Sequence, residues 1–303
     1  MKIDLIIPIF NEEENLQILT DRISESLDPL NYEYTIIFVD DGSFDNSWNI
    51  IKNLSQERPT ISGIKLSRNF GHQSAIDAGL KSSTSEAVII MDGDLQDDPK
   101  YIPELISEWE KGNKVVLAKR IKRHDGILRS FIFNIYFNFQ SMFSDINIPK
   151  YVGHFSLLDK RVVLEMNNFP EKKKYFNGLR AYIGFSTTYV NVEKNKRYKG
   201  KTKMPFGKLL KLGLDGIFGF TTKPLTFIGI VGILISLSSI TVPILSLMNI
   251  GIEIDLGLEM VLLYFLSGIQ LLALSLLGKY LGTVFIEIKN RPNFIIESTT
   301  KNK

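Results

Sequence analysis

The sequence predicts an α/β protein in which a mostly parallel sheet domain is followed by a two-helix transmembrane hairpin. Three observations support this fold class. Short apolar runs alternate with helix-like segments over residues 2–118, which is typical of a doubly wound parallel sheet. Acidic residues follow directly after several of these apolar runs. Beyond Lys223, two long stretches without a charged residue begin.

The spacing of apolar residues predicts each element of the sheet domain in turn. Strands are expected at 2–8, 34–39, 63–66, 87–91 and 115–118, because these runs are short and rich in Ile and Val. Helices are expected at 12–27, 44–54, 73–81 and 101–111, where the apolar residues have helical spacing. The residues from Glu297 onward are expected to form a loose polar tail.

Composition narrows the classes of function. The 303-residue chain is 44% apolar, which is enough to bury a full α/β domain. Its formal charge of +3 argues against a nucleic-acid partner. The absence of cysteine excludes disulfides and cysteine metal sites. Residues 1–14 lack the apolar core and cleavage site of a signal peptide, so we expect the sheet domain to stay in the cytoplasm.

Two uncharged stretches predict the membrane hairpin. As helices, 225–252 would extend about 40 Å and 260–278 is close to the usual minimum for crossing a bilayer. The connection between them contains acidic residues but no Lys or Arg, whereas the outer flanks carry Lys208, Lys211, Lys223, Lys279, Lys289 and Arg291. The positive-inside rule therefore predicts an integral protein of the cytoplasmic membrane with both termini cytoplasmic. Two buried helices of a soluble domain are the alternative.

These features divide the chain into four expected parts. The sheet domain covers 1–204, a juxtamembrane amphipathic helix 205–224, the two transmembrane helices 225–279, and a cytoplasmic tail 280–303. Two segments, 127–143 and 206–220, have the amphipathic pattern of helices that lie in a membrane interface. Burial inside the protein is the alternative for the first of them.

The most informative motif follows the strand expected at 87–91. Asp92 and Asp94 come directly after this apolar run, so a turn can aim both carboxylates at one hard cation. Open α/β sheets bind ligands at this carboxyl edge. Mg²⁺ or Mn²⁺ held by one or two carboxylates usually completes its shell with water and substrate phosphate oxygens. An acidic turn before a helix that starts near Pro99 is the plain structural alternative.

Three strand ends carry polar motifs at the same predicted edge. Besides Asp92 and Asp94, these are the run at 8–12, which ends in Asn11 and Glu12, and the Asp-Asp-Gly-Ser run at 40–43. Carboxylates there can accept hydrogen bonds from a nucleobase or ribose. Asn11 and Ser43 could each instead cap a helix. The three motifs together favour a site for a nucleoside diphosphate.

Four motifs together resemble glycosyltransferase family 2. They are Pro-x-Phe-Asn-Glu at 8–12, Asp-Asp-Gly-Ser at 40–43, Arg-Asn-Phe-Gly-His-Gln at 68–73 and Asp-Gly-Asp-Leu-Gln-Asp at 92–97. Within that family the chain looks like the polyprenyl-phosphate glycosyltransferases, and the resemblance runs over nearly all of it, from Lys2 to Phe294. It implies the Rossmann-like GT-A fold and inversion at the anomeric carbon.

The resemblance also implies roles for individual residues. The nucleoside-binding positions are matched by Pro8, Phe10, Glu12, Asp40 and Asp41. Asp92 and Asp94 match the metal and pyrophosphate motif, with Gln96 as a further metal contact, and Arg120 matches a donor-contacting arginine. In the loop 197–203, Arg197 and Lys203 would hold phosphates. A basic cluster attracted to anionic lipid is the alternative for that loop.

Two histidines are harder to interpret. His72 is expected to be a polar residue that caps the following helix, with a ligand or base as the alternative. His154 stands where many bacterial relatives carry Asp or Asn between Gly and Phe. A lipid-phosphate nucleophile is already anionic, so a strong base is dispensable. His154 is therefore expected to contact the acceptor phosphate, with second-layer packing as the alternative.

Together these expectations describe an enzyme that transfers a hexose to a lipid. The donor is expected to be UDP-glucose, with UDP-N-acetylhexosamines and GDP-mannose as alternatives, and the acceptor undecaprenyl phosphate at the cytoplasmic membrane face. The product would serve later glycosylation of the cell envelope. A processive polysaccharide synthase is disfavoured because the chain lacks a Gln-x-x-Arg-Trp motif. A non-catalytic nucleotide-sugar sensor is the other alternative. Two spans per chain leave little membrane scaffold, which favours a homo-oligomer.

Overall fold

The computed structural model of the chain describes residues 1–121, 149, 151–172, 174–193, 225–226, 228–235 and 256–300. The chain divides into two compact units. The first comprises Met1–Phe137, Ile146–Lys208 and Pro292–Lys303, and the second comprises Asn138–Asp145 and Leu209–Arg291. The first unit contains all the described strands, and the second contains the longest described helix.

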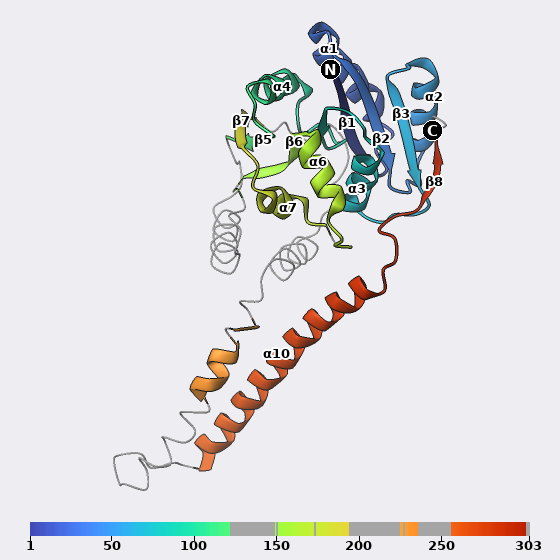
Figure 1. Cartoon of the computed structure of the whole chain (residues 1–303). Helices are drawn as coiled ribbons and strands as arrows, with labels where there is room; N and C mark the ends of the chain where they lie inside the picture. Colours follow the sequence, from blue (N-terminus) through green and yellow to red (C-terminus); the bar gives the residue numbers. More distant parts are fainter. Residues whose placement is uncertain are drawn as a thin grey trace. The chain divides into compact units, whose positions relative to one another are not determined.

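An eight-stranded sheet forms the centre of the first unit, in the order β7-β5-β6-β4-β1-β2-β3-β8 (Figure 1). Its strands are β1 (Lys2–Ile9), β2 (Glu33–Asp40), β3 (Ile61–Leu66), β4 (Ala87–Ile90), β5 (Val115–Arg120), β6 (Val152–Asp159), β7 (Thr187–Val192) and β8 (Ile296–Thr299). The pairs β1–β2, β1–β4, β2–β3 and β5–β7 are parallel. β6 runs antiparallel to β4 and β5, and β8 runs antiparallel to β3. The mostly parallel sheet is confirmed.

Helices cover both faces of this sheet (Figure 1). On one face, α1 (Leu16–Leu27), α2 (Ser47–Glu57) and α4 (Ile102–Glu110) pack on alternate residues of β1 and its neighbours. On the other face lie α3 (His72–Ser82), α6 (Lys160–Asn168) and α7 (Phe176–Ile183). α3 approaches β1 closely at Gly79, where a Cβ would lie 2.3 Å from Ile6 Cγ2. Two short 3-10 helices, η1 (Asp28–Leu30) and η2 (Pro99–Tyr101), complete the connections.

The C-terminal segment is not the loose tail that its polar composition predicted. Residues 296–299 form β8 at the edge of the sheet beside β3. Beyond the strand, the backbone N–H of Thr300 donates to Gly63 O at 3.0 Å, and Gly63 N–H donates to Thr300 Oγ1 at 2.8 Å. Lys65 and Glu297 form an ion pair at 2.8 Å. The prediction failed because these contacts join residues more than two hundred positions apart.

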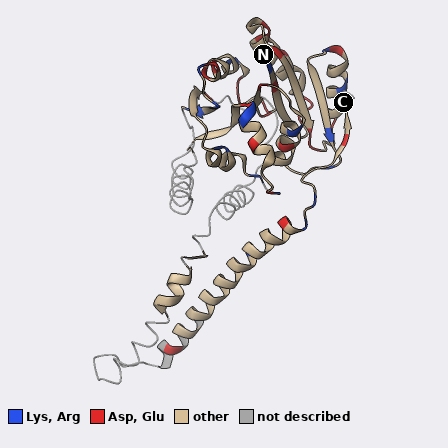
Figure 2. Cartoon of the chain, viewed as in Figure 1, with Lys and Arg blue, Asp and Glu red and all other residues tan. Residues whose placement is uncertain are grey.

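The described part of the second unit is dominated by α10 (Leu256–Ile288). Within the residues that the structure describes, one helical stretch, Phe265–Ile288, is long and apolar enough to cross a membrane. In Figure 2 the ribbon of α10 is tan, the colour of residues other than Lys, Arg, Asp and Glu, over most of its length. Its large apolar side chains, such as Leu271 and Leu272, are exposed. The first expected span, 225–252, is described only at 225–226 and 228–235. The two segments predicted to be amphipathic helices, 127–143 and 206–220, lie entirely outside the described residues.

Candidate active site

The loops that follow β1 and β2 are joined by reciprocal hydrogen bonds. Asn11 N–H donates to Ser43 Oγ at 2.9 Å, and Phe44 N–H donates to Asn11 Oδ1 at 2.8 Å. Asn11 has a positive φ of 53°, a conformation that Asn tolerates better than most residues. The helix-capping alternative is therefore wrong for Asn11 and Ser43, because α1 begins after Asn15 and α2 after Asn46. Because residues of these two hydrogen-bonded loops are not helical, α1 and α2 both begin later than predicted.

The predicted nucleoside-binding residues of β1 lie at this loop pair. Pro8 is buried within the strand, and Phe10, just after it, is half-buried. The Phe10 ring makes an edge contact with the ring of Phe44, with centroids 6.0 Å apart, and Phe44 is 87% exposed. Glu12 accepts a hydrogen bond from Asn15 Nδ2 at 2.6 Å. An exposed aromatic surface beside carboxylates suits the stacking of a base.

Asp40 is the last residue of β2 and Asp41 follows it, and their carboxylates accept hydrogen bonds from different loops. Asp40 is fully buried; its Oδ1 accepts from Ser43 N–H at 3.1 Å, while its Oδ2 has no hydrogen-bond partner among the described residues. Asp41 accepts from the backbone N–H groups of Phe70 and Gly71 at 2.7 and 2.9 Å. Burial raises the pKa of both carboxyls, although these N–H groups partly oppose the effect. Asp41 thus ties the loop after β3 to the end of β2.

Asp92 and Asp94 lie in the turn after β4, at the carboxyl edge of the sheet. Gly93 between them lies close to β1: a Cβ there would be 2.6 Å from the terminal methyl Cδ1 of Ile9 and 3.3 Å from Pro8 O. Asp94 Oδ1 accepts from Gln96 N–H at 3.1 Å, which closes the turn. Asp92, Asp94 and Gln96 are all half-buried, so each remains partly accessible to a ligand. The structure therefore places the three predicted metal-binding residues in one turn.

His72 takes part in the site, contrary to its expected role as a helix cap. The N-cap of α3 is Gly71, and the His72 side chain lies against Asp92, with Nε2 3.0 Å from Oδ1. Burial acts to lower the pKa of His72, but the hydrogen bond and charge of Asp92 outweigh it and the pKa is raised. The sequence held a signal for this position, because residues 68–73 follow a strand whose carboxyl end lies at the same edge.

His154 of β6 lies beside this pair. Ile90 of β4 pairs with Ser156 of β6, so continuing the antiparallel register places Asp92 level with His154. The rings of His72 and His154 are 4.8 Å apart, and Gln73 Nε2 lies 3.3 Å from His154 Nε2. Burial, reinforced by the nearby positive charge of His72, lowers the pKa of His154 to about 3. His154 is therefore a neutral group near neutral pH.

The predicted cationic residues are only partly described. Arg120 ends β5 as expected, and its guanidinium lies against β6, because a Cβ on Gly153 would be 3.0 Å from Arg120 Nη2. Arg120 therefore lies next to the backbone that carries His154. Arg197 and Lys203 lie outside the described residues.

The residues present fit a divalent cation that takes some of its ligands from the protein and the others from a substrate. Throughout the described ranges, no group of three or more His, Asp or Glu side chains is arranged to enclose a metal ion. The turn instead offers the carboxylates of Asp92 and Asp94, a donor set that suits Mg²⁺ or Mn²⁺ when phosphate oxygens and water supply the other ligands.

Comparisons with known proteins show the family of the chain. Residues 4–166 match the family described as Glycosyl transferase family 2. An uncharacterized glycosyltransferase of Synechocystis sp. is 36% identical, and the match covers 98% of this chain and 95% of that protein. A prophage bactoprenol glucosyl transferase homolog of Escherichia coli is 35% identical, with 99% of this chain and 100% of that protein covered.

A solved structure shows the same fold. Glucosyl-3-phosphoglycerate synthase from Mycobacterium tuberculosis, in complex with Mn²⁺, UDP and phosphoglyceric acid, matches with a TM-score of 0.52 at 15% identity. The match covers 72% of this chain and 76% of that chain. At this identity the likeness concerns the fold alone.

Proposed function

The chain belongs to glycosyl transferase family 2, and from that premise we propose that it transfers a hexose from a nucleotide-diphosphate sugar to a polyprenyl phosphate at a membrane surface. The observation that carries the proposal is the shared sheet edge. There the turn with Asp92 and Asp94 lies one strand from the loop after β1, which is joined to the loop after β2. Such an edge can hold the diphosphate and the nucleoside of one donor at the same time.

The chemistry follows from where charge develops during transfer. The bond between the anomeric carbon and the donor diphosphate breaks, and an oxygen of the prenyl phosphate forms the new bond from the opposite face, which inverts the configuration. Asp92 and Asp94, with help from Gln96, would hold Mg²⁺ or Mn²⁺, whose positive charge would stabilise the departing diphosphate. Arg120, Arg197 and Lys203 are proposed to contact phosphate oxygens of the substrates. Catalysis then consists mainly of positioning and charge stabilisation.

The acceptor needs no general base, because its phosphate is anionic near neutral pH. A neutral His154 suits this reaction better than a carboxylate would, since it adds no negative charge beside the incoming phosphate. We propose that His154 contacts this phosphate. The matching Escherichia coli protein is named for bactoprenol and glucose, which supports undecaprenyl phosphate as acceptor and UDP-glucose as donor.

A lipid acceptor also requires attachment to a membrane. The long apolar helix within α10 supports membrane anchoring, and the proposed arrangement is the hairpin at 225–279 with both termini cytoplasmic. The catalytic unit is proposed to cover 1–204, to which the structure adds the C-terminal segment through β8. The homo-oligomer stays a prediction.

Replacing the two turn carboxylates tests the proposal. In full-length Asp92→Asn and Asp94→Asn proteins, the rate of metal-dependent glycolipid formation should in each case fall at least about a hundredfold. Each variant lacks one carboxylate for the cation whose charge would stabilise the leaving diphosphate. The matched control is Asp21→Asn, because Asp21 on α1 is paired with Arg58 outside the site. Near-normal turnover of a folded Asp94→Asn protein would contradict the assigned role. A wild-type protein that binds the donor but transfers sugar to no lipid would favour the sensor alternative.

A further inference from the structure

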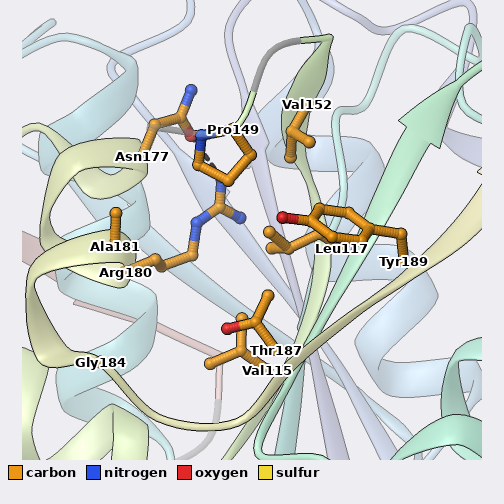
Figure 3. Close-up of a pocket in the computed structure, with 10 residues that line it drawn as sticks. All are labelled: Val115, Leu117, Pro149, Val152, Asn177, Arg180, Ala181, Gly184, Thr187 and Tyr189. Atoms are coloured by element: carbon orange, nitrogen blue, oxygen red, sulfur yellow. Dashed lines mark hydrogen bonds between the residues drawn. The ribbon is translucent and has the colours of Figure 1, made fainter. Parts of the chain in front are cut away.

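A small cavity lies between α7, β5, β6 and β7 (Figure 3). Its volume is about 200 Å³, and it is lined by Val115, Leu117, Pro149, Val152, Asn177, Arg180, Ala181, Gly184, Thr187 and Tyr189. It is smaller than the pockets that enclose whole drug-sized ligands. Such a cavity suits the head of a longer molecule whose remainder extends outside.

Arg180 gives this otherwise mainly apolar cavity a positive charge. The residue is only 4% exposed. Its Nη1 donates to Ser156 Oγ at 2.7 Å, and its Nη2 donates to Gly153 O at 2.8 Å and to Asn177 Oδ1. Each of these acceptors is neutral, and no carboxylate among the described residues pairs with the guanidinium.

The guanidinium keeps unused hydrogen-bonding capacity. Arginine has five N–H donors, and the buried Nε of Arg180 has no partner among the described residues. Burial lowers the pKa of Arg180 to about 10, so the group remains charged near neutral pH. A buried cation without a counter-ion is costly, and an anion entering the cavity would relieve that cost.

The cavity is also linked to the predicted acceptor contact. Arg180 bonds to Gly153 and Ser156, the residues on either side of His154 and Phe155 in β6. Ser156 Oγ in turn donates to His154 O at 2.8 Å. An anion bound by Arg180 would therefore lie close to the backbone that positions His154.

We propose that this cavity binds the head of the lipid acceptor, with the phosphate at Arg180 and the first isoprenyl carbons against Leu117, Val152 and Tyr189. The inference rests on the proposed function for the identity of the acceptor. It assigns to Arg180 and the surrounding apolar side chains a specificity for a phosphate that carries an apolar chain.

The assignment is tested by measuring how tightly farnesyl phosphate, a short prenyl phosphate, binds to the full-length protein in detergent. Inorganic phosphate, which lacks the apolar chain, is the comparison ligand. Arg180→Met removes the charge, and Ala181→Leu fills the cavity while keeping a good helix former. Arg161→Met is the matched control, because it removes a charge from an exposed position on α6. UDP binding reports whether each variant retains a folded donor site.

Arg180→Met and Ala181→Leu should each weaken farnesyl phosphate binding by about tenfold or more, while UDP binding and the Arg161→Met variant stay within about twofold of wild type. Inorganic phosphate should bind the wild type far more weakly than farnesyl phosphate. The assignment is overturned if Ala181→Leu binds UDP and also keeps the wild-type affinity for farnesyl phosphate, or if inorganic phosphate binds equally well.

Turnover separates this inference from the proposed function. If the wild type binds farnesyl phosphate in a manner sensitive to Ala181→Leu but transfers no sugar, the proposed function fails and the cavity assignment stands. If the wild type transfers sugar and both variants keep the wild-type KM for the prenyl phosphate, the cavity assignment fails and the proposed function stands.

Discussion

Gly42 provides a sharp test of how the site is built. It follows Asp40 and Asp41 with a positive φ of 69°, and a Cβ on it would lie 2.5 Å from the backbone carbon of Arg68 and 2.7 Å from the nitrogen of Asn69. Both are backbone atoms, so the clash cannot be relieved by moving a side chain. Replacing Gly42 with Ala must therefore displace the loop that leads to Phe70 and Gly71, whose N–H groups bond to Asp41.

The size of the effect follows from these contacts. A non-glycine residue in the left-handed region costs about 1–2 kcal/mol. Loss of the two hydrogen bonds to Asp41 adds about 1 kcal/mol each. The total of about 3–4 kcal/mol should lower the melting temperature by about 10 °C in a domain of this size. Because the moved loop leads directly into His72 at the start of α3, the affinity for UDP should fall by about tenfold.

Thermal unfolding and UDP titration of Gly42→Ala check this result, with Gly112→Ala as the matched control. Gly112 also has a positive φ, of 100°, but a Cβ on it would meet nothing within 4 Å. It precedes β5 and so lies at the opposite edge of the sheet from the site. The control should lose about 1–2 kcal/mol and keep its UDP affinity. Equal losses in both variants, or wild-type UDP binding by Gly42→Ala, would refute the reasoning.

Three further predictions concern the fold and the site. Thr300→Val should lower the free energy of unfolding by about 1–3 kcal/mol, because Gly63 N–H loses its acceptor. Thermal unfolding measures this, and an unchanged melting temperature would contradict it. Asp159 should stabilise the protein less as the pH falls. Its hydrogen bonds from Lys114, Trp109 and the backbone N–H of Arg161 outweigh the effect of burial, so its pKa is lower in the folded protein than in the unfolded chain. Its contribution to stability is therefore fully present above the unfolded-state pKa and is lost as the pH falls through the folded-state pKa. The melting temperatures of wild type and Asp159→Asn should converge in acid, and a constant difference would contradict this. His154→Gln should keep the shape of the wild-type pH–rate profile between about pH 6 and 8, because a histidine with a pKa of about 3 does not titrate there; a lost ionisation in that range would show that His154 titrates.

The first half of the fold could be predicted because local pattern and tertiary role agree there. The strands that became β1, β2 and β4 are buried on both faces, so each appears in the sequence as a continuous apolar run. β6 and β7 were missed. The first three residues of β6, which include His154, are only partly buried, and only Val190 and Val192 of β7 are buried. β8 was missed because its polar sequence forms a strand only through pairing with β3.

The positions of the candidate site residues, as distinct from their roles, could also be predicted in part. Asp92 and Asp94 could be located because they directly follow an apolar run, and the ends of parallel strands meet at one edge. The role of His72 depends on a contact with Asp92 twenty positions away, and that of Arg180 on burial against β6. Neither contact leaves a periodic pattern in the sequence. Such side chains are identified only when the register of the sheet is known.

The most direct test of the central claim is product formation by the full-length protein with undecaprenyl phosphate, Mg²⁺ or Mn²⁺ and a panel of labelled nucleotide sugars. We predict a chloroform-soluble glycolipid from one donor, UDP-glucose first, and its complete loss on addition of EDTA. Absence of a glycolipid from every donor, despite metal-dependent binding of UDP or GDP, would contradict the account and favour a protein that binds nucleotide sugars without transferring them.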